Sequence, residues 1–276
     1  MFLKLFSLFF FFFFFLSSSN STELMGKLEQ GGIAYGWAKP GEKLFLDKRE
    51  ISIDKNGFFI FGLGRNAKPE SILVTKYQDG THSEKVIEIL KRDWIEERVN
   101  GLPSNKVSPN KKTLERIRQE GSLISIARKK TLEKIFFLNG FMQPSQGRIS
   151  GVFGSQRILN GLPRSPHSGL DIAAPVGTPV RATADGIVSL VHEDMVLTGK
   201  TIIIDHGMGL NSVYIHLNDI YVKQNQSVLQ GDKIATIGMT GRTTGPHLHF
   251  GISWYSVKLD PQTVMSALPL GNNLID

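Results

Sequence analysis

The chain has 276 residues, of which 41% are hydrophobic and 21% charged, enough to build one or two domains with real cores. The formal net charge of +7 favours an anionic partner. The basic residues form no dense block with interleaved aromatic side chains, so we do not expect nucleic-acid binding. Cysteine is absent, which excludes disulfides, thiolate nucleophiles and cysteine-ligated metal centres, so any metal must be held by His, Asp or Glu.

Residues 1–19 carry one lysine and then a nearly unbroken apolar run, MFLKLFSLFFFFFFFLSSS. The run from Leu5 to Leu16 is about 12 residues long, short of the roughly 20 that span a bilayer. This layout predicts a cleaved signal peptide, and an uncleaved N-terminal anchor stays open because no A-x-A cleavage site is visible. Either alternative predicts an exported protein of the periplasm or cell envelope, with no membrane contact beyond this segment.

Residues 25–95 predict a small antiparallel β-domain that resembles a sandwich. Apolar and alternating runs are joined by the turn signals Pro40-Gly41, Asn56-Gly57 and Asp79-Gly80. The histidine of this segment, His82, lies in a polar stretch beside a turn, and we assign it no role.

Residues 96–140 predict a linker followed by an amphipathic helix that begins at Ser108-Pro109, with serine as the N-cap and proline in the first turn. Such a helix is either an arm that covers a groove or partner, or a connector packed on its own protein, and the second is favoured. Its apolar face is expected to hold the following residues at helical spacing: Leu114, Ile117, Gly121, Ile124 and Ala127.

Residues 146–265 predict a second, all-β domain, because short β-like runs alternate with glycine-rich turns and no convincing long helix appears. The whole chain is therefore expected to be mostly β, with this antiparallel domain preceded by the sandwich-like domain and the helical connector. This second domain holds six of the seven histidines.

Three short elements of this domain carry candidate chemistry. In His247-Leu248-His249, strand alternation places both histidines on one face, where they need a metal, a substrate or water as a partner. In Tyr214-Ile215-His216-Leu217, the same alternation predicts that His216 shares a polar face with Tyr214. In His167-Ser168-Gly169-Leu170-Asp171, the glycine is expected to let the backbone bend so that His167 and Asp171 converge.

Two histidines and one aspartate suit a catalytic zinc ion, which takes nitrogen and oxygen ligands and keeps one position open for water. Such an ion stays a strong Lewis acid and lowers the pKa of its water toward 7. No H-E-x-x-H motif is present, so a glutamate base of that class is excluded, and the two remaining histidines are candidates for the base and the oxyanion donor.

Other polar residues of this domain are expected to be structural. His206 lies at a strand-to-turn junction, His192 and Glu193 on a surface turn, and Asp185 in an Ala-Asp-Gly turn.

The stretch from Arg148 to Pro261 resembles the catalytic domain of the lysostaphin-like, LytM-type zinc metallopeptidases, which cut peptide bonds in peptidoglycan. The matching text is GRISGVFGSQR, HSGLDIAAPVGTPVRATADGIV, VYIHL, QGDKIATIGMTGRTTGPHLHF and LDP.

The resemblance implies an antiparallel β catalytic domain with a narrow groove. It also implies one zinc ion per chain, held by His167, Asp171 and His249, with His216 and His247 as the catalytic pair. It implies a peptidoglycan endopeptidase that hydrolyses stem peptides or cross-bridges during wall remodelling. The rival hypothesis is a binding or activating protein that keeps the fold without turnover. Neither the bond cleaved nor the oligomeric state follows from the sequence.

Overall fold

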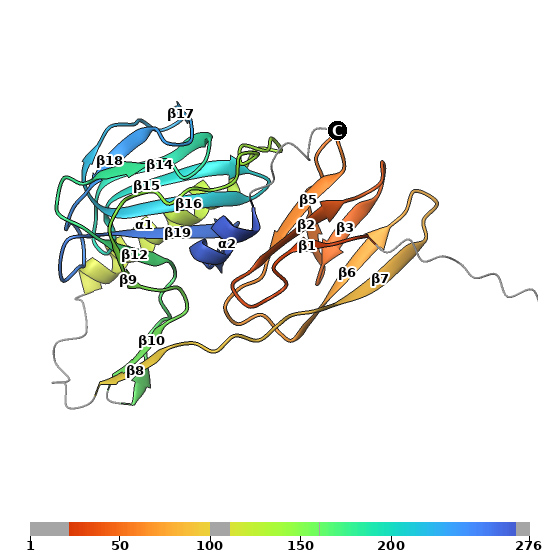
Figure 1. Cartoon of the computed structure of the whole chain (residues 1–276), viewed down its shortest axis with the longest axis horizontal. Helices are drawn as coiled ribbons and strands as arrows, with labels where there is room; N and C mark the ends of the chain where they lie inside the picture. Colours follow the sequence, from red (N-terminus) through yellow and green to blue (C-terminus); the bar gives the residue numbers. More distant parts are fainter. Residues whose placement is uncertain (1–21, 100–110, 160, 269–276) are drawn as a thin grey trace, which may run out of the picture.

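The computed structural model describes residues 22–99, 111–159 and 161–268, which fold into two β-rich bodies placed side by side (Figure 1). The predicted signal or anchor at residues 1–19 and the predicted helix cap at Ser108-Pro109 lie outside the described residues. None of the helices among the described residues has both the length and the apolar character needed to cross a bilayer.

The N-terminal body contains two antiparallel sheets, one ordered β1-β2-β5 and the other β4-β3-β6-β7. Apolar side chains from both sheets, such as Ile33, Leu44 and Ile60, belong to one buried cluster, as expected of a sandwich. Its strands are β1 (Met25–Gly26), β2 (Ile33–Trp37), β3 (Lys43–Leu46), β4 (Arg49–Ile51), β5 (Phe58–Gly62), β6 (Glu70–Lys76) and β7 (His82–Glu88).

The predicted linker contains a short strand, β8 (Glu96–Val99), so this part of the prediction is wrong. Strand β8 pairs in parallel with β10 (Gln156–Leu159), which also pairs with β11 (Leu162–Pro163). Hydrophobic alternation does not predict this strand, because it contains exposed polar residues such as Glu96 and Arg98.

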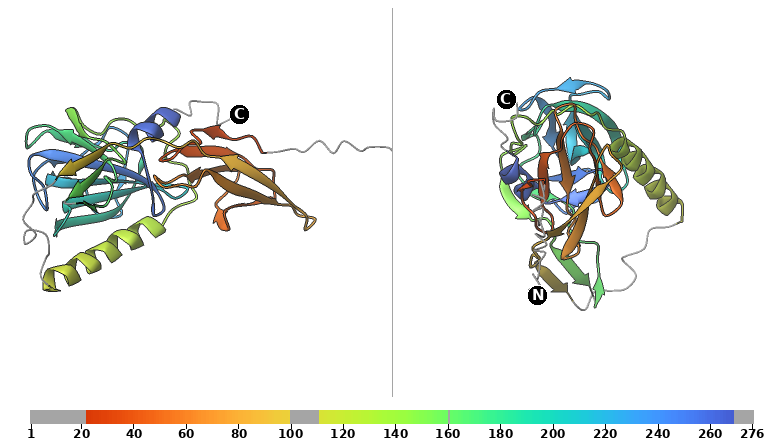
Figure 2. Two further views of the ribbon diagram at one scale, coloured as in Figure 1. Left: turned by 90° about the horizontal axis from the view of Figure 1, so that it is seen from below. Right: turned by 90° about the vertical axis from the view of Figure 1, so that its right-hand side faces the viewer.

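Helix α1 (Lys111–Lys129) lies along one face of the large sheet of the second body (Figure 2). Ala127 is buried with Leu190, Met195 and Ile203 of that sheet, and Ile124 packs beside them. The helix therefore packs on its own chain, which agrees with the connector rather than with an arm that covers a groove or partner.

The second body is built on a ten-stranded sheet whose main path runs β17-β14-β15-β16-β19-β12-β9. Strand β18 pairs with β13 and β16, and β20 pairs with β19. The elements are β9 (Arg148–Gly151), β12 (Leu170–Ala173), β13 (Pro179–Arg181), β14 (Gly186–Met195), β15 (Gly199–Gly207), β16 (Leu210–Ile220), β17 (Ser227–Val228), β18 (Lys233–Ile237), β19 (His247–Trp254), β20 (Val257–Leu259) and the short helix α2 (Pro261–Ala267).

The two bodies share one hydrophobic core rather than meeting through a polar seam. A Cβ on Gly62 of β5 would lie 2.7 Å from Leu259 and 2.9 Å from Trp254, so the backbones approach closely there. Arg92 forms an ion pair of 2.9 Å with Asp260, the N-cap of α2. Such a continuous apolar contact fixes the relative position of the bodies more firmly than a transient interface would.

Candidate active site

Strand pairing places Asp171 and His249 directly opposite each other, because β12 and β19 are antiparallel neighbours in that register. His247 lies two residues before His249 on the same strand and pairs with Ala173. Side chains two residues apart on a strand share a face, so the predicted common face of the two histidines is confirmed. His167 comes from the loop just before β12.

Three ligand atoms converge at this point. Nε2 of His167 lies 3.0 Å from Oδ1 of Asp171 and 3.0 Å from Nδ1 of His249, and the third pair, His249 Nδ1 and Asp171 Oδ1, lies 2.8 Å apart. The structure thus brings together all three residues that the sequence predicted as metal ligands. These spacings lie a few tenths of an ångström below the about 3.3 Å between tetrahedral ligands at zinc bond lengths.

The hydrogen bonds of His167 support a cation at this point. Its Nδ1 lies 2.9 Å from the carbonyl oxygen of Val152, which can only accept, so Nδ1 carries the proton. In the neutral ring, Nε2 then carries no proton, and it faces the Asp171 carboxylate. An acceptor against an acceptor is unfavourable unless a positive ion lies between them, and a backbone partner of this kind is typical of metal-bound histidine.

The protonation states suit a metal. Burial raises the pKa of Asp171, but its close contacts with the His167 and His249 rings outweigh this effect and hold that pKa well below its usual range, so the carboxylate is ionised. Burial lowers the pKa of His249, and its ion-pair partner Asp171 offsets this only in part. A neutral imidazole and an ionised carboxylate are the forms that bind metal.

Two glycines make room for these ligands. A Cβ on Gly151 would lie 2.6 Å from Oδ2 of Asp171, and a Cβ on Gly169 would lie 2.8 Å from Nε2 of His249. Gly169 lies in a bend directly before β12, as the sequence predicted, and its lack of a side chain also allows the close approach of His249. Sequence reasoning missed Gly151, because its distance along the chain from His167 and Asp171 does not indicate that it lies beside them.

His216 and His247 form a second pair beside the ligands, with ring centroids 4.8 Å apart. Nδ1 of His216 donates to the carbonyl of Thr240 at 2.8 Å, and Nδ1 of His247 donates to the carbonyl of Gly245 at 2.9 Å. In both rings Nδ1 carries the proton when the ring is neutral, so Nε2 is the atom available to accept one. Nε2 of His247 lies 3.8 Å from Oδ1 of Asp171, so this pair borders the ligand cluster.

The predicted face of His216 is wrong. Tyr214 pairs opposite Phe250 and lies fully buried in the core, with the two rings 5.4 Å apart, whereas His216 faces His247. The backbone explains the difference, because His216 has a φ of +63° that interrupts the alternation of β16. Such left-handed conformations in non-glycine residues cost energy and cluster at functional sites.

Burial lowers the pKa of His216 to about 4, and the Thr240 carbonyl offsets this only in part. The ring is therefore neutral near pH 7 and has a lone pair at Nε2. The hydroxyl of Thr243 lies 3.1 Å from Nδ1 of His247 and 2.8 Å from the carbonyl of Gly245, which steadies the loop that holds this ring. Sequence reasoning missed these contacts of Thr240 and Thr243.

The remaining candidates are structural. His206 is fully buried, with Nδ1 2.6 Å from the Asp185 carbonyl and Nε2 2.7 Å from the Ser212 hydroxyl. Asp185 accepts from the backbone of Gln230 in a bend, as expected of a turn residue. His192 and Glu193 lie in the last part of β14 and not on a turn, because pairing with β15 continues to Met195.

Comparisons with known proteins agree with this geometry. Residues 165–261 match the model of peptidase family M23, a range that includes all five site residues. Peptidoglycan DD-endopeptidase ShyB of Vibrio cholerae is 43% identical over 110 residues, which cover 40% of this chain and 25% of that protein. DD-carboxypeptidase/endopeptidase Mpg of Neisseria meningitidis is 40% identical over 103 residues, which cover 37% of this chain and 23% of that protein.

The chain thus spans about a quarter of the length of these curated relatives. A crystal structure of a candidate M23 peptidase from Pseudomonas aeruginosa superposes with a TM-score of 0.69 at 28% identity, covering 88% of this chain and 97% of that one. That superposition includes both β-bodies, so the mostly β fold predicted from the sequence is confirmed. Residues 165–261 of the chain therefore match peptidase family M23, and the fold is similar to that of the Pseudomonas aeruginosa structure.

Proposed function

We propose that the chain is a zinc-dependent endopeptidase that hydrolyses amide bonds in peptidoglycan stem peptides or cross-bridges during wall remodelling. The observation that carries this proposal is the convergence of His167, Asp171 and His249 within hydrogen-bonding distance, bordered by a second histidine pair. The names of the relatives, peptidoglycan DD-endopeptidase and DD-carboxypeptidase/endopeptidase, support this substrate class.

The three ligand residues would hold one zinc ion, which when bound supplies a Lewis acid that polarises the scissile carbonyl and acidifies water. Asp171 contributes negative charge, and the bond from His167 to Val152 fixes the ring that presents Nε2. Gly151 and Gly169 keep the backbone close without blocking the ligands.

His216 and His247 would handle the proton and the developing charge. Each ring is oriented by a backbone carbonyl at Nδ1, so each presents Nε2 toward the reacting groups without rotating. One Nε2 would accept the proton of the attacking water, and the other, once protonated, would donate a hydrogen bond to the oxyanion.

We further propose that the protein acts in the cell envelope, where its substrate lies. The apolar N-terminal segment and the wall-acting relatives support export, and the net charge of +7 suits an anionic wall polymer.

The test is to incubate the purified chain with peptidoglycan, with and without a chelator, and to identify the released muropeptides by mass. We expect soluble products that disappear on chelation and return with added zinc. Zinc-loaded protein that releases nothing from any wall type would contradict the enzymatic proposal and favour a binding or activating role.

A further inference from the structure

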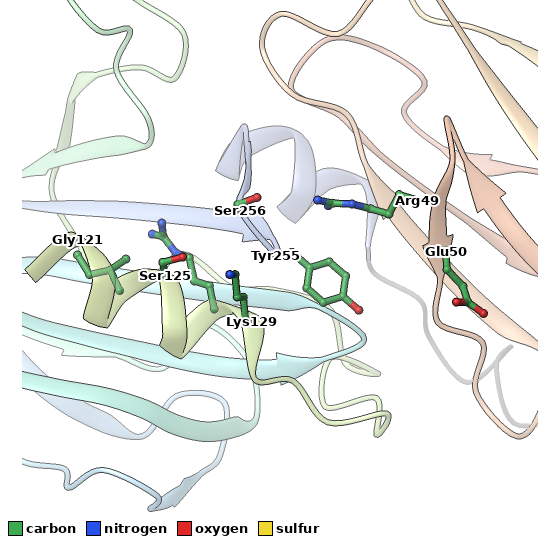
Figure 3. Close-up of a pocket in the computed structure, with 9 residues that line it drawn as sticks. Arg49, Glu50, Gly121, Ser125, Lys129, Tyr255 and Ser256 are labelled. Carbon is green, nitrogen blue, oxygen red and sulfur yellow. The ribbon is translucent and has the colours of Figure 1, made fainter. Parts of the chain in front are cut away.

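A cavity of about 420 Å³ lies where three parts of the chain meet: helix α1, the turn between β19 and β20, and strand β4 of the N-terminal body (Figure 3). Its lining includes Arg49, Arg128 and Lys129 but none of the five site residues. The cavity is therefore separate from the candidate active site, and the proposed peptidase function does not explain it.

Arg128 is the most unusual residue of this cavity. Its Nε atom is buried and has no hydrogen-bond partner, and no ion pair joins its guanidinium to any carboxylate of the described residues. A buried, unsatisfied donor is costly and usually indicates a missing water or ion. Burial also lowers the pKa of Arg128 to about 10.

A second guanidinium is held at the opposite wall. Arg49 stacks over the rings of Trp254 and Tyr255, at 5.2 Å and 5.7 Å from their centroids. Figure 3 shows Arg49 pointing toward Ser256, with Lys129 at the end of the helix on the other side of Tyr255. This stacking reduces the entropy that Arg49 would lose on binding a ligand.

Negative charge is scarce around the cavity. Glu50 is the acidic residue among the described lining residues, it forms no ion pair with Arg49, and its carboxylate points away from the Arg49 guanidinium in Figure 3. Positive charge extends to Lys258, whose pKa is lowered to about 7 by burial and by the charge of Arg128. Arg49, Arg128 and Lys129 thus line one cavity, and no ion pair joins any of them to a carboxylate of the described residues.

We propose that this cavity binds a phosphate group, either as inorganic phosphate or as a phosphomonoester, between Arg49, Arg128 and Lys129. Two guanidinium groups and an ammonium supply donors from several directions, which matches the several acceptor oxygens of a phosphate. The bound group would bridge the N-terminal body, the connector helix and the M23 domain. It would therefore stabilise the arrangement of these three parts.

The test measures phosphate binding to the full chain by calorimetry at constant ionic strength. Inorganic phosphate is titrated in one arm and glycerol 3-phosphate in the other. We expect saturable binding in at least one arm, weakened about tenfold or more by Arg128→Gln, since a hydrogen bond to a charged group has about that effect. Arg49→Gln, an exposed position, gives a second variant that does not disturb the helix packing.

Arg118→Gln is the matched control, because Arg118 lies exposed on the same helix outside the cavity. The substitution removes one positive charge, as Arg128→Gln does. Its affinity should equal that of the unaltered chain. The proposal is overturned if neither ligand binds, if Arg118→Gln weakens binding as much as Arg128→Gln, or if binding survives unchanged in both cavity variants. The last result would place the phosphate elsewhere, for instance at the metal centre.

Discussion

Asp171 and His249 face each other across the β12–β19 ladder, with Oδ1 of the aspartate 2.8 Å from Nδ1 of the histidine. Backbone hydrogen bonding therefore sets the positions of two of the three candidate ligands. A one-residue slip of either strand would turn its ligand to the opposite face of the sheet. Only His167 depends on a loop, and its bond to the Val152 carbonyl fixes it in place.

Gly151→Ala should weaken zinc binding, because the added Cβ would lie 2.6 Å from Oδ2 of Asp171. We expect a loss of about tenfold to a hundredfold in affinity, the range seen when groups that orient a ligand are disturbed. Competition with a fluorescent chelator measures the zinc affinity of each variant. Gly245→Ala is the control, since nothing lies within 4 Å of its added Cβ. Equal zinc affinity in both variants would show that Gly151 does not make room for the ligand.

Thr243→Val should lower kcat, because it removes the hydroxyl that contacts both His247 Nδ1 and the Gly245 carbonyl. We expect a loss of roughly tenfold in turnover with zinc content unchanged, since Thr243 steadies a proposed catalytic ring and contacts no ligand. Thr243→Ser keeps the hydroxyl and should retain most activity. If the serine variant is as impaired as the valine variant, the hydroxyl is not the group that matters.

His206 should make the fold less stable as the pH falls. Burial lowers its pKa to about 4 from 6.5, so between these values the unfolded chain binds a proton that the folded chain excludes. Stability is then highest above pH 6.5 and decreases toward pH 4, by roughly 3 kcal/mol for this group alone. Asp205 acts in the opposite sense, because burial raises its pKa.

Urea unfolding of the unaltered chain and of His206→Gln, measured from pH 7 to pH 4, isolates the histidine, since Asp205 is present in both. The variant should show a flatter pH dependence, whatever its absolute stability. His82→Gln, at an exposed position in the N-terminal body, should change nothing. Parallel pH curves for the His206 variant and the unaltered chain would show that His206 is not the titrating group.

Local sequence signals predicted some turns of the N-terminal body better than others. Asp79-Gly80 joins β6 and β7 as an ordinary hairpin, with a φ of +85° at the glycine. The turn at Asp47-Lys48, which joins β3 and β4 with a positive φ at both residues, was not predicted. The strands supply that conformation, because Asp-Lys does not favour it on its own.

Residue type and strand alternation identified the candidate histidines and Asp171, and the resemblance to the LytM-type peptidases implied which three of them are the ligands. The orientation of His216 could not, because its positive φ arises where β16 leaves regular pairing, and alternation assumes that a strand continues unbroken. Carbonyl partners such as those of Val152 and Thr240 also escape prediction, since every residue has a carbonyl and only the fold selects one.

We propose that His249 holds the metal, whereas His216 acts on the substrate. The most direct test measures bound zinc and muropeptide release in His249→Ala and His216→Ala, with circular dichroism to confirm folding. We predict that His249→Ala loses both zinc and activity, and that His216→Ala keeps one zinc per chain while its activity falls to background. Loss of zinc from folded His216→Ala, or one zinc per chain in His249→Ala, would contradict this assignment of the two histidines.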